Sequence, residues 1–173
     1  IFVSKETDIS PFPSSKLIDD ASYALGLVYF QKQDYNSSKE IFQKFPEEFP
    51  DSSLKPQAMY LLGTSLYNIG DFAGAIEVYK NIIRLFSQDI ELVQKAEYEI
   101  ADCYYRMGNE KEAMTRFNML RVKYPDSSLT TAIMWWLGED YHRPTDFNLA
   151  LRYSSSLIHD FPPSALIPDA YYA

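Results

Sequence analysis

The sequence predicts an all-α fold, built as a linear array of repeated pairs of helices. Three observations predict this fold. The first is an internal repeat with a period of 37–38 residues, and the second is a helical spacing of apolar residues inside each unit. The third is composition: 46% of the 173 residues are hydrophobic and 16% are aromatic, but only six are Gly. Few Gly argue against a turn-rich β-sandwich, and many aromatic residues favour a folded core over disorder.

Three series of residues define the repeat. The first is an aromatic residue followed by Pro or Ser, at intervals of 37, 37, 38 and 37 residues: Phe12-Pro13, Phe49-Pro50, Phe86-Ser87, Tyr124-Pro125 and Phe161-Pro162. The second is an aliphatic residue followed by a small one: Leu25-Gly26, Leu62-Gly63, Ile100-Ala101 and Leu137-Gly138. The third is a small residue: Ser38, Ala75, Ala113 and Ala150. We expect the small residues of the last two series to face each other, so that two helices approach closely.

The second unit shows how the helix pair follows from the pattern. Ala58, Leu62 and Leu66 are spaced by four residues, as on one face of a helix, which we name helix A. Gly70-Asp71 interrupts the pattern as a turn, and a second apolar series predicts helix B: Phe72, Ala75, Tyr79 and Ile82. The Pro that follows helix B in most units cannot continue a helix, and the Ser residues after it suit the N-cap of the next helix.

The units follow each other along the chain. Residues 1–18 form an N-terminal segment, interpreted as the remnant of a preceding unit, although residues 1–10 match helix B poorly. Four units are predicted at about 19–55, 56–93, 94–130 and 131–167, and a fifth helix A starts at 168–173. We therefore expect the full protein to have more repeats on at least one side.

Two units depart from the pattern inside their helix pair. In the first, Pro46 lies inside helix B and is expected to kink or shorten it. The third unit turns at Gly108-Asn109, but the fourth lacks this Gly and has Arg143-Pro144-Thr145 near its turn. We expect the turn of the fourth unit to be atypical.

The pattern resembles the tetratricopeptide repeat, with Tyr104, Ala113, Phe117 and Pro125 as the matching residues of the third unit. The other units match at Tyr29, Ser38, Phe42 and Pro50; at Leu66, Ala75, Tyr79 and Ser87; and at Tyr141, Ala150, Ser154 and Pro162. The resemblance covers about residues 19–173 and implies a right-handed superhelical solenoid of helix-turn-helix units. It also implies the core residues Tyr29, Tyr104, Tyr141, Phe42, Tyr79 and Phe117.

The period is longer than the roughly 34 residues of the common tetratricopeptide repeat. The additional residues fall before helix A, as at Asp51-Ser52-Ser53-Leu54, and we expect them to add a turn to it. A long helix A after Tyr124-Pro125-Asp126-Ser127-Ser128 resembles the repeats of bacterial envelope proteins. Examples are the periplasmic coordinator of the Tol–Pal system and the lipoprotein of the outer-membrane β-barrel assembly machine. This resemblance implies a periplasmic or outer-membrane-associated location, with the cytoplasm as the alternative.

In this family helix A lines the concave face of the superhelix, and the resemblance places two rows of rings there. The first row lies three residues before the small position: Tyr23, Tyr60, Tyr98, Trp135 and Tyr172. The second lies four residues after it: Phe30, Tyr67, Tyr105 and His142. Seven residues separate the rows, so they share a helix face. Arg106 and Arg143 follow directly after the second row.

These residues form the candidate groove for a partner. Tyr and Trp suit peptide recognition, since they combine a large rigid area with a polar group, and Arg106 and Arg143 could pair with an acidic group. The alternative is that the rings are mainly structural, buried against the neighbouring helix A with only an edge exposed. The carboxylate clamp of some family members is not expected, because it needs a Lys and an Asn where this chain has Tyr23 and Leu27.

Charge and residue content narrow the function classes. The net charge of -8 is shared by both halves of the chain, so a nucleic acid or an anionic lipid surface is not an expected partner. No apolar run reaches the roughly 18 residues of a membrane span, so we expect no membrane insertion of this segment. The single Cys103 allows neither an intrachain disulfide nor a multi-Cys metal site, and no cofactor is expected.

The sequence has no recognisable catalytic arrangement, so we expect no enzymatic activity. His142 and His159 are not at ligand spacing to a Cys or to each other, and no Gly-rich phosphate loop or nucleophile elbow is present. The carboxylates Glu97, Glu99 and Asp102, and those of Glu139 and Asp140, are interpreted as a solvated face rather than a glycosidase pair.

Three functional hypotheses follow. The favoured one is a scaffold that binds a segment of a partner protein and assembles a complex in a bacterial envelope. The first alternative is a structural module that associates with itself through its repeat ends or convex face. The second is a glycan or peptidoglycan binder, because ring stacking on sugars uses the same residue types.

Overall fold

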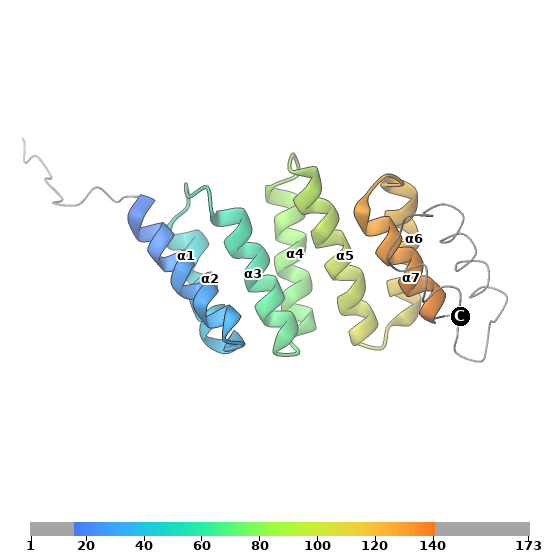
Figure 1. The fold of residues 1–173 in the computed structure, drawn as a ribbon, viewed down its shortest axis with the longest axis horizontal. Coiled ribbons are helices and arrows are strands. Elements are labelled where there is room, and N and C mark those ends of the chain that lie inside the picture. Colours follow the sequence, from blue (N-terminus) through green and yellow to red (C-terminus); the bar gives the residue numbers. More distant parts are fainter. Residues whose placement is uncertain (1–15, 141–173) are drawn as a thin grey trace, which may run out of the picture.

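The computed structural model describes residues 16–140 of the chain and the side chains of residues 17–134. This part is all-helical, as predicted, and no strand occurs in it. Its seven helices are α1 (Lys16–Gln31), α2 (Tyr35–Glu48), α3 (Lys55–Asn68), α4 (Phe72–Leu85), α5 (Ile90–Arg106), α6 (Glu110–Lys123) and α7 (Ser128–Asp140). They follow each other in chain order along one row (Figure 1).

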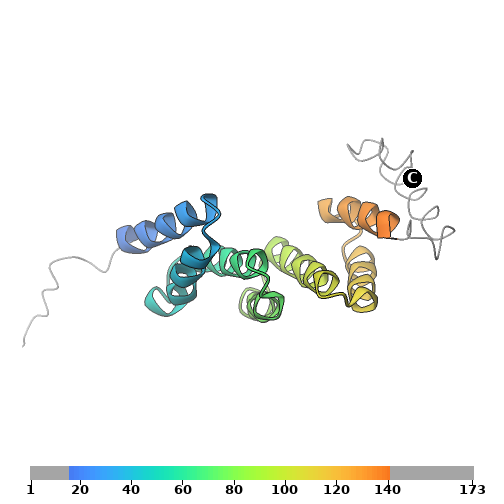
Figure 2. The same ribbon diagram turned by 90° about the horizontal axis from the view of Figure 1, so that it is seen from below.

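The row is a solenoid in which helices A (α1, α3, α5 and α7) alternate with helices B (α2, α4 and α6). Each helix packs mainly on its neighbours in the chain, and α1 also contacts α3 as α5 contacts α7. Figure 2 shows that the row is curved, with α1 and α7 on the inner side of the curve and α4 on its outer side. We call the surface along which successive helices A meet the inner face. The predicted fold class is confirmed.

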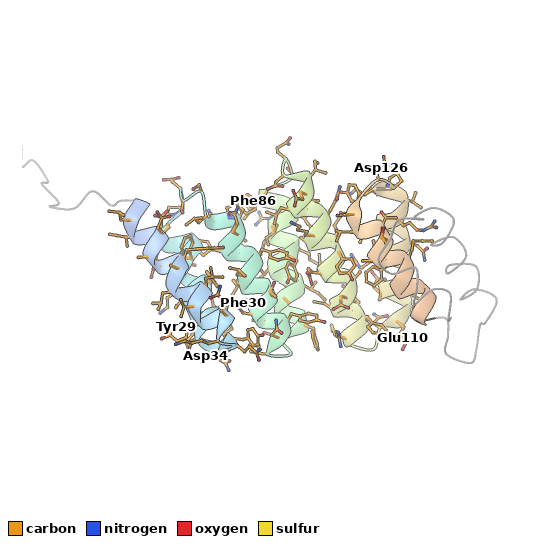
Figure 3. All side chains as sticks on the ribbon, viewed as in Figure 1. Tyr29, Phe30, Asp34, Phe86, Glu110 and Asp126 are labelled. Atoms are coloured by element: carbon orange, nitrogen blue, oxygen red, sulfur yellow. The ribbon has the colours of Figure 1, made fainter. Side chains whose placement is uncertain are left out.

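The turns from helix A to helix B lie along one edge of the row, and the junctions from helix B to the next helix A lie along the other. Figure 3 shows this by the positions of Asp34 and Glu110 at one edge and of Phe86 and Asp126 at the opposite edge. This arrangement follows from pairing antiparallel helices of similar length, since helices B all have 14 residues.

Each turn between helix A and helix B has the same two devices. The first is a residue with positive φ: Gln33 at 60°, Gly70 at 84° and Gly108 at 77°. The second is an N-cap residue whose side chain accepts the backbone N–H three positions on: Asp34 from Ser37 at 3.2 Å, Asp71 from Gly74 at 2.9 Å and Asn109 from Glu112 at 3.4 Å. The predicted turns at Gly70-Asp71 and Gly108-Asn109 are thus confirmed.

Helices A and B approach closely at glycine, but the partner differs from the prediction. A Cβ atom on Gly63 would lie 2.6 Å from Cε1 of Tyr79, and one on Gly26 would lie 2.7 Å from Cζ of Phe42. These rings come one helical turn after Ala75 and Ser38, the partners we expected. The small residue on helix A therefore makes room for an aromatic ring of helix B, not for a second small residue.

The small residue on helix B of the first unit instead faces the following unit. Ser38 of α2 and Ser65 of α3 are both fully buried, and their hydroxyl oxygens are 3.1 Å apart in a hydrogen bond. This contact joins helix B of one unit to helix A of the next. The predicted core rings Phe42, Tyr79 and Phe117 are fully buried. The other predicted core rings within the described residues, Tyr29 and Tyr104, are only half-buried.

Some local expectations at the helix ends were wrong. Pro46 does not shorten α2, which has the same 14 residues as α4 and α6, because Pro46 lies in the last turn, where little helix remains to be disrupted. Asp51–Leu54 form turns rather than an added helical turn, and α3 begins at Lys55, whereas the longer helix A that we expected occurs in α5, which has 17 residues. Ser52 is not the N-cap of α3, because that position is Leu54, which has no side-chain cap.

Serine has another role at these junctions, where it joins helices A of successive units. The Ser127 hydroxyl donates to Oε1 of Gln94 at 2.8 Å and accepts the N–H of Leu129 at 3.3 Å. Ser52 makes the corresponding bonds two repeats earlier: it donates to the carboxylate of Asp19 and accepts the N–H of Leu54 at 3.2 Å. The serine thus fixes the start of one helix A against the preceding helix A.

The expectations for residues 1–15, for Arg143-Pro144-Thr145, for Ala150 and for a fifth helix A lie outside the described residues.

Candidate functional site

The first row of predicted rings lies on the inner face and is held from behind by helix B. Tyr23, Tyr60 and Tyr98 are each half-buried. Each packs on the buried ring of its own helix B, with ring centres 5.7 Å apart for Tyr23–Phe42, 5.7 Å for Tyr60–Tyr79 and 5.3 Å for Tyr98–Phe117. The interplanar angles are 57°, 57° and 60°, so one geometry recurs in three units. The rings are therefore fixed in orientation before any partner arrives.

In two of the three described units, the ring of the second row also packs on an aromatic ring of its own helix B. Phe30 packs edge-on to Tyr35, and Tyr67 packs edge-on to Phe72, both with ring centres 5.4 Å apart. In the third unit the position of helix B that corresponds to Tyr35 and Phe72 is Glu110. All three members of the row, Phe30, Tyr67 and Tyr105, are half-buried. The rings thus combine a structural contact with an exposed edge.

Tyrosine hydroxyls tie α3 to α5 across the inner face. Tyr60 donates to Oε1 of Glu99 at 2.7 Å, and Tyr67 donates to the carboxylate of Asp102. The Tyr67 oxygen also accepts from Nε of Arg106 at 2.7 Å. Arg106 lies 3.7 Å from Asp102 and places its guanidinium carbon 5.8 Å from the centre of the Tyr67 ring. We call these five residues the α3–α5 bridge.

The bridge changes the role expected for Arg106. The sequence predicted that Arg106 pairs with an acidic group of a partner, but in the structure its partners are Asp102 and Tyr67 of its own chain. The acids Glu97, Glu99 and Asp102 do not lie on a solvated face as expected: all three are half-buried, and Glu97 pairs with Lys123 of α6 at 2.8 Å. The side chains of Trp135, Glu139, Asp140, His142 and Arg143, and Tyr172, lie outside the described residues.

Burial affects the ionisable groups around the bridge. The pKa of Glu99 is raised, mainly because burial disfavours the carboxylate and also because Asp102 is near, while the Tyr60 hydrogen bond acts in the opposite direction. Burial and the two acids raise the pKa of Tyr98 to about 12. The thiol of Cys103, fully buried beneath them, has its pKa raised to about 12 for the same reasons. The Tyr98 hydroxyl and the Cys103 thiol therefore stay protonated near neutral pH.

Sequence reasoning did not identify Glu99 or the bridging role of Asp102. The signal was present as residue spacing: Tyr60 and Glu99 are 39 residues apart, and Tyr67 and Asp102 are 35 apart. Each value is close to one repeat period, so each pair occupies neighbouring helices A at nearly the same height. Such a spacing between a donor and an acceptor on the same helix face predicts a contact between units.

A cavity of about 370 Å³ lies on the inner face beside the bridge, where the middle of α1 meets the first halves of α3 and α5. Its apolar lining comes from the first row of rings and from leucines near it: Tyr23, Leu27, Tyr60, Leu61 and Leu92. Within the described residues no group of three or more His, Cys, Asp or Glu side chains could hold a metal ion. No helix of that part of the chain is long and apolar enough to cross a membrane.

Comparison with known proteins agrees with this geometry. A sequence model described as tetratricopeptide repeat matches three segments, residues 20–52, 57–89 and 95–127. The chain belongs to the tetratricopeptide repeat family.

Solved structures support the same fold. This tetratricopeptide repeat protein is similar to the crystal structure of PcrH in complex with the chaperone binding region of PopB. The sequence identity is 18%, the TM-score is 0.52, and the alignment covers 82% of this chain and 95% of the other. At this identity the likeness concerns the fold alone. A comparison with curated protein sequences finds no match.

Proposed function

We propose that this protein is a non-enzymatic scaffold whose inner face binds a segment of a partner protein. The observation that carries the proposal is the recurrence of half-buried rings in three successive units, each held in place by a helix B ring. Rings that are already fixed lose little conformational freedom on binding, so their exposed edges contribute efficiently to affinity. The similar structure of PcrH, which is bound to a segment of PopB, supports a peptide-like ligand.

A photo-crosslinking amino acid placed at single positions tests which face of the solenoid contacts the partner. Asn68 on α3 and Asn81 on α4 are both exposed; Asn68 directly follows Tyr67 of the inner row, and Asn81 lies on a helix B. A crosslinking amino acid at position 68 should capture a protein, and the same group at position 81 should not. Capture at both positions, or only at 81, would contradict the inner-face proposal. Capture of a glycan at position 68 would favour the sugar-binding alternative.

The identified partner then allows a quantitative test. Alanine at Tyr60 or at Tyr98 removes one exposed ring edge and should weaken affinity about tenfold or more, as for other aromatic anchors. Because each ring also packs on helix B, thermal unfolding must show that the variant is folded at the assay temperature. Unchanged affinity in both folded variants would exclude the rows as the binding site.

We propose in addition that the scaffold acts in a bacterial cell envelope, in the periplasm or at the outer membrane. The supporting observations are the period of 37–38 residues and the junction sequence Tyr124-Pro125-Asp126-Ser127-Ser128. Fractionation of cells that produce the full-length protein at its natural level is the direct test. Recovery in the cytoplasmic fraction would refute this location without affecting the binding proposal.

The uncovered face of α1 favours self-association as a second candidate function. Leu25 is 51% exposed and Val28 is 44% exposed, whereas Leu62 and Ile100, which correspond to Leu25 in the next units, are buried. In those units the equivalent face is covered by the preceding helix B, so a second copy of the chain could cover it here. Sedimentation should then show a concentration-dependent dimer that Leu25→Lys abolishes. The matched control is Leu85→Lys on α4, because Leu85 is 50% exposed. A monomer at all concentrations rules this candidate out.

A further inference from the structure

The cavity between α1, α3 and α5 has the size and lining of a binding pocket for a single large side chain. Its volume of about 370 Å³ is within the range of about 300–1,000 Å³ that is usual for ligand sites. Rings of Tyr23 and Tyr60 and the aliphatic side chains of Leu27, Leu61 and Leu92 line it. Both Tyr rings are fixed by Phe42 and Tyr79 behind them, so the pocket is formed in advance.

Repeat register explains why the space is open at this point of the inner face. One unit further on, the α3–α5 bridge fills the corresponding region with the carboxylates of Glu99 and Asp102 and the hydroxyl of Tyr67. The residues of the preceding unit in the same register are Leu61, Thr64 and Phe30. Leu61, which lines the cavity, has no polar group with which to bond to the Tyr23 hydroxyl as Glu99 bonds to Tyr60 in the next unit.

The opening of the cavity carries a small excess of negative charge. Lys95 and Glu91 form an ion pair of 2.6 Å, with 46% and 79% of their side chains exposed. Asp89 adds a further carboxylate, which is held in place because its Oδ1 accepts the N–H of Leu92 at 3.0 Å as the cap of α5. The three side chains together carry one net negative charge, and the whole chain carries -8. Both charges favour a cationic ligand over an anionic one.

From this geometry we propose that the cavity binds one bulky apolar side chain of a partner segment, flanked by a lysine or arginine that reaches Asp89 and Glu91. The apolar anchor is buried against Leu27, Leu61 and the two Tyr rings. The neighbouring cation stays at the exposed opening, where it keeps most of its hydration. This inference rests on the proposed function, since it specifies what the partner places on the inner face.

Two short synthetic peptides are suitable probes. Both carry one phenylalanine in a glycine–serine background, flanked by arginines in the first peptide and by glutamates in the second. Titration is followed by NMR of methyl and ring signals. The arginine peptide should shift the methyl signals of Leu27, Leu61 and Leu92 and bind more tightly than the glutamate peptide. The preference should decrease with added salt, because the charges at the opening are exposed.

Two variants at the opening change its charge in opposite directions. Lys95→Gln removes the cation and should strengthen binding of the arginine peptide about two- to threefold, whereas Glu91→Gln should weaken it by a similar factor. Lys80→Gln and Glu77→Gln on α4 are the matched controls, because that ion pair of 2.8 Å is similarly exposed, at 49% and 69%. Each control changes the net charge of the chain as its counterpart does, but should leave the affinity unchanged.

A third variant tests the apolar anchor independently of charge. Leu27→Trp fills the cavity and should weaken binding of both peptides about tenfold, provided that circular dichroism shows an unchanged helix content. A peptide with alanine in place of its phenylalanine should lose binding to the same extent. Unchanged binding in either case would overturn the proposal.

The identity of the residues whose NMR signals shift distinguishes failure of this inference from failure of the proposed function. Shifts at Tyr98 and Tyr105, with none at the three leucines, would refute the cavity as the anchor site and leave the inner face as the binding surface. Shifts confined to helices B would contradict both. Equal affinity of the arginine and glutamate peptides would refute the charge preference, and the absence of any shift with either peptide would refute the cavity site. The crosslinking test at Asn68 would still decide the proposed function.

Discussion

At the residue scale, one of the three described turns from helix A to helix B has a residue with a side chain where the other two have glycine. Gln33 has φ of 60°, in the left-handed region that Gly70 and Gly108 adopt in the corresponding turns. This conformation costs a residue with a Cβ atom roughly 1–2 kcal/mol. Gln33→Gly should therefore raise the free energy of unfolding by about 0.5–1 kcal/mol, after the greater freedom of glycine in the unfolded chain is allowed for. Urea unfolding measures this, with Lys32→Gly as the control, which should not stabilise the protein.

The contact between Gly63 and Tyr79 predicts that Gly63→Ala lowers the free energy of unfolding, whereas Gly→Ala inside a helix usually raises it. Gly→Ala inside a helix normally stabilises it by about 1 kcal/mol. At Gly63 the new methyl group would lie 2.6 Å from a ring that is completely buried and cannot move aside. Gly63→Ala should lower the free energy of unfolding by about 1–3 kcal/mol, as expected for overpacking. A stabilised variant would show that the helix pair has room to separate.

The raised pKa of Glu99 predicts a pH dependence of stability. An acid with a higher pKa in the folded state binds its proton more tightly there, so its contribution to stability is largest below its unfolded pKa, where the group is protonated in both states. This contribution is lost as pH rises from the unfolded pKa, about 4.3, through the folded one. Glu99→Gln keeps an acceptor for Tyr60 but has no charge to bury. It should stabilise the protein at pH 7 and have little effect below pH about 4, measured by denaturant unfolding at both pH values. A variant that is destabilised at pH 7 would mean that the charged Tyr60–Glu99 bond outweighs burial.

At the scale of elements, the order and type of the helices followed from the repeat, but the details of their ends did not. Periodicity predicts which faces are buried, and the turns at Gly70 and Gly108 were recognisable because glycine adopts positive φ. Pro46 misled because its effect depends on its distance from the end of the helix, which the repeat locates only within a residue or two. The expected capping role holds for Ser127, which accepts the N–H of Leu129, but its second bond to Gln94, 33 residues away, was not predicted.

The serine junction therefore predicts a coupling between α5 and α7. Ser127→Ala removes the hydrogen bond to Gln94 and the acceptor for the Leu129 N–H, and should destabilise the protein by about 1 kcal/mol. Its neighbour Ser128 is exposed and has no such bond, so Ser128→Ala is the control and should change stability by less than about 0.5 kcal/mol. Equal losses of both variants in thermal unfolding would mean that the effect does not depend on the Ser127–Gln94 bond.

At the scale of the whole molecule, the contacts between units are unequal although the units look alike in sequence. The rows of inner rings were predictable, because they repeat at fixed register, and six of them lie half-buried on helices A. The α3–α5 bridge and the cavity could not be predicted from the repeat, because each arises where adjacent units differ. Glu99 and Asp102 occupy the positions at which the preceding unit has Leu61 and Thr64. A repeat pattern describes the average unit, whereas the binding surface depends on departures from it.

This inequality predicts how the array opens. In a solenoid each unit is stabilised only by its neighbours, so local unfolding starts where an interface is weak or absent. Helix α1 has exposed apolar residues and is joined to the start of α3 through Ser52 and Asp19, whereas the bodies of α3 and α5 are joined through Tyr60, Tyr67 and Arg106. Hydrogen exchange should be fastest in α1 and slowest in α3, α4 and α5. Tyr67→Phe, which removes both hydrogen bonds of that hydroxyl, should speed exchange in α3 and α5, while Tyr29→Phe in α1 should not. Uniform exchange along residues 16–140 would instead mean that the described helices unfold as one cooperative unit, with every interface of similar strength.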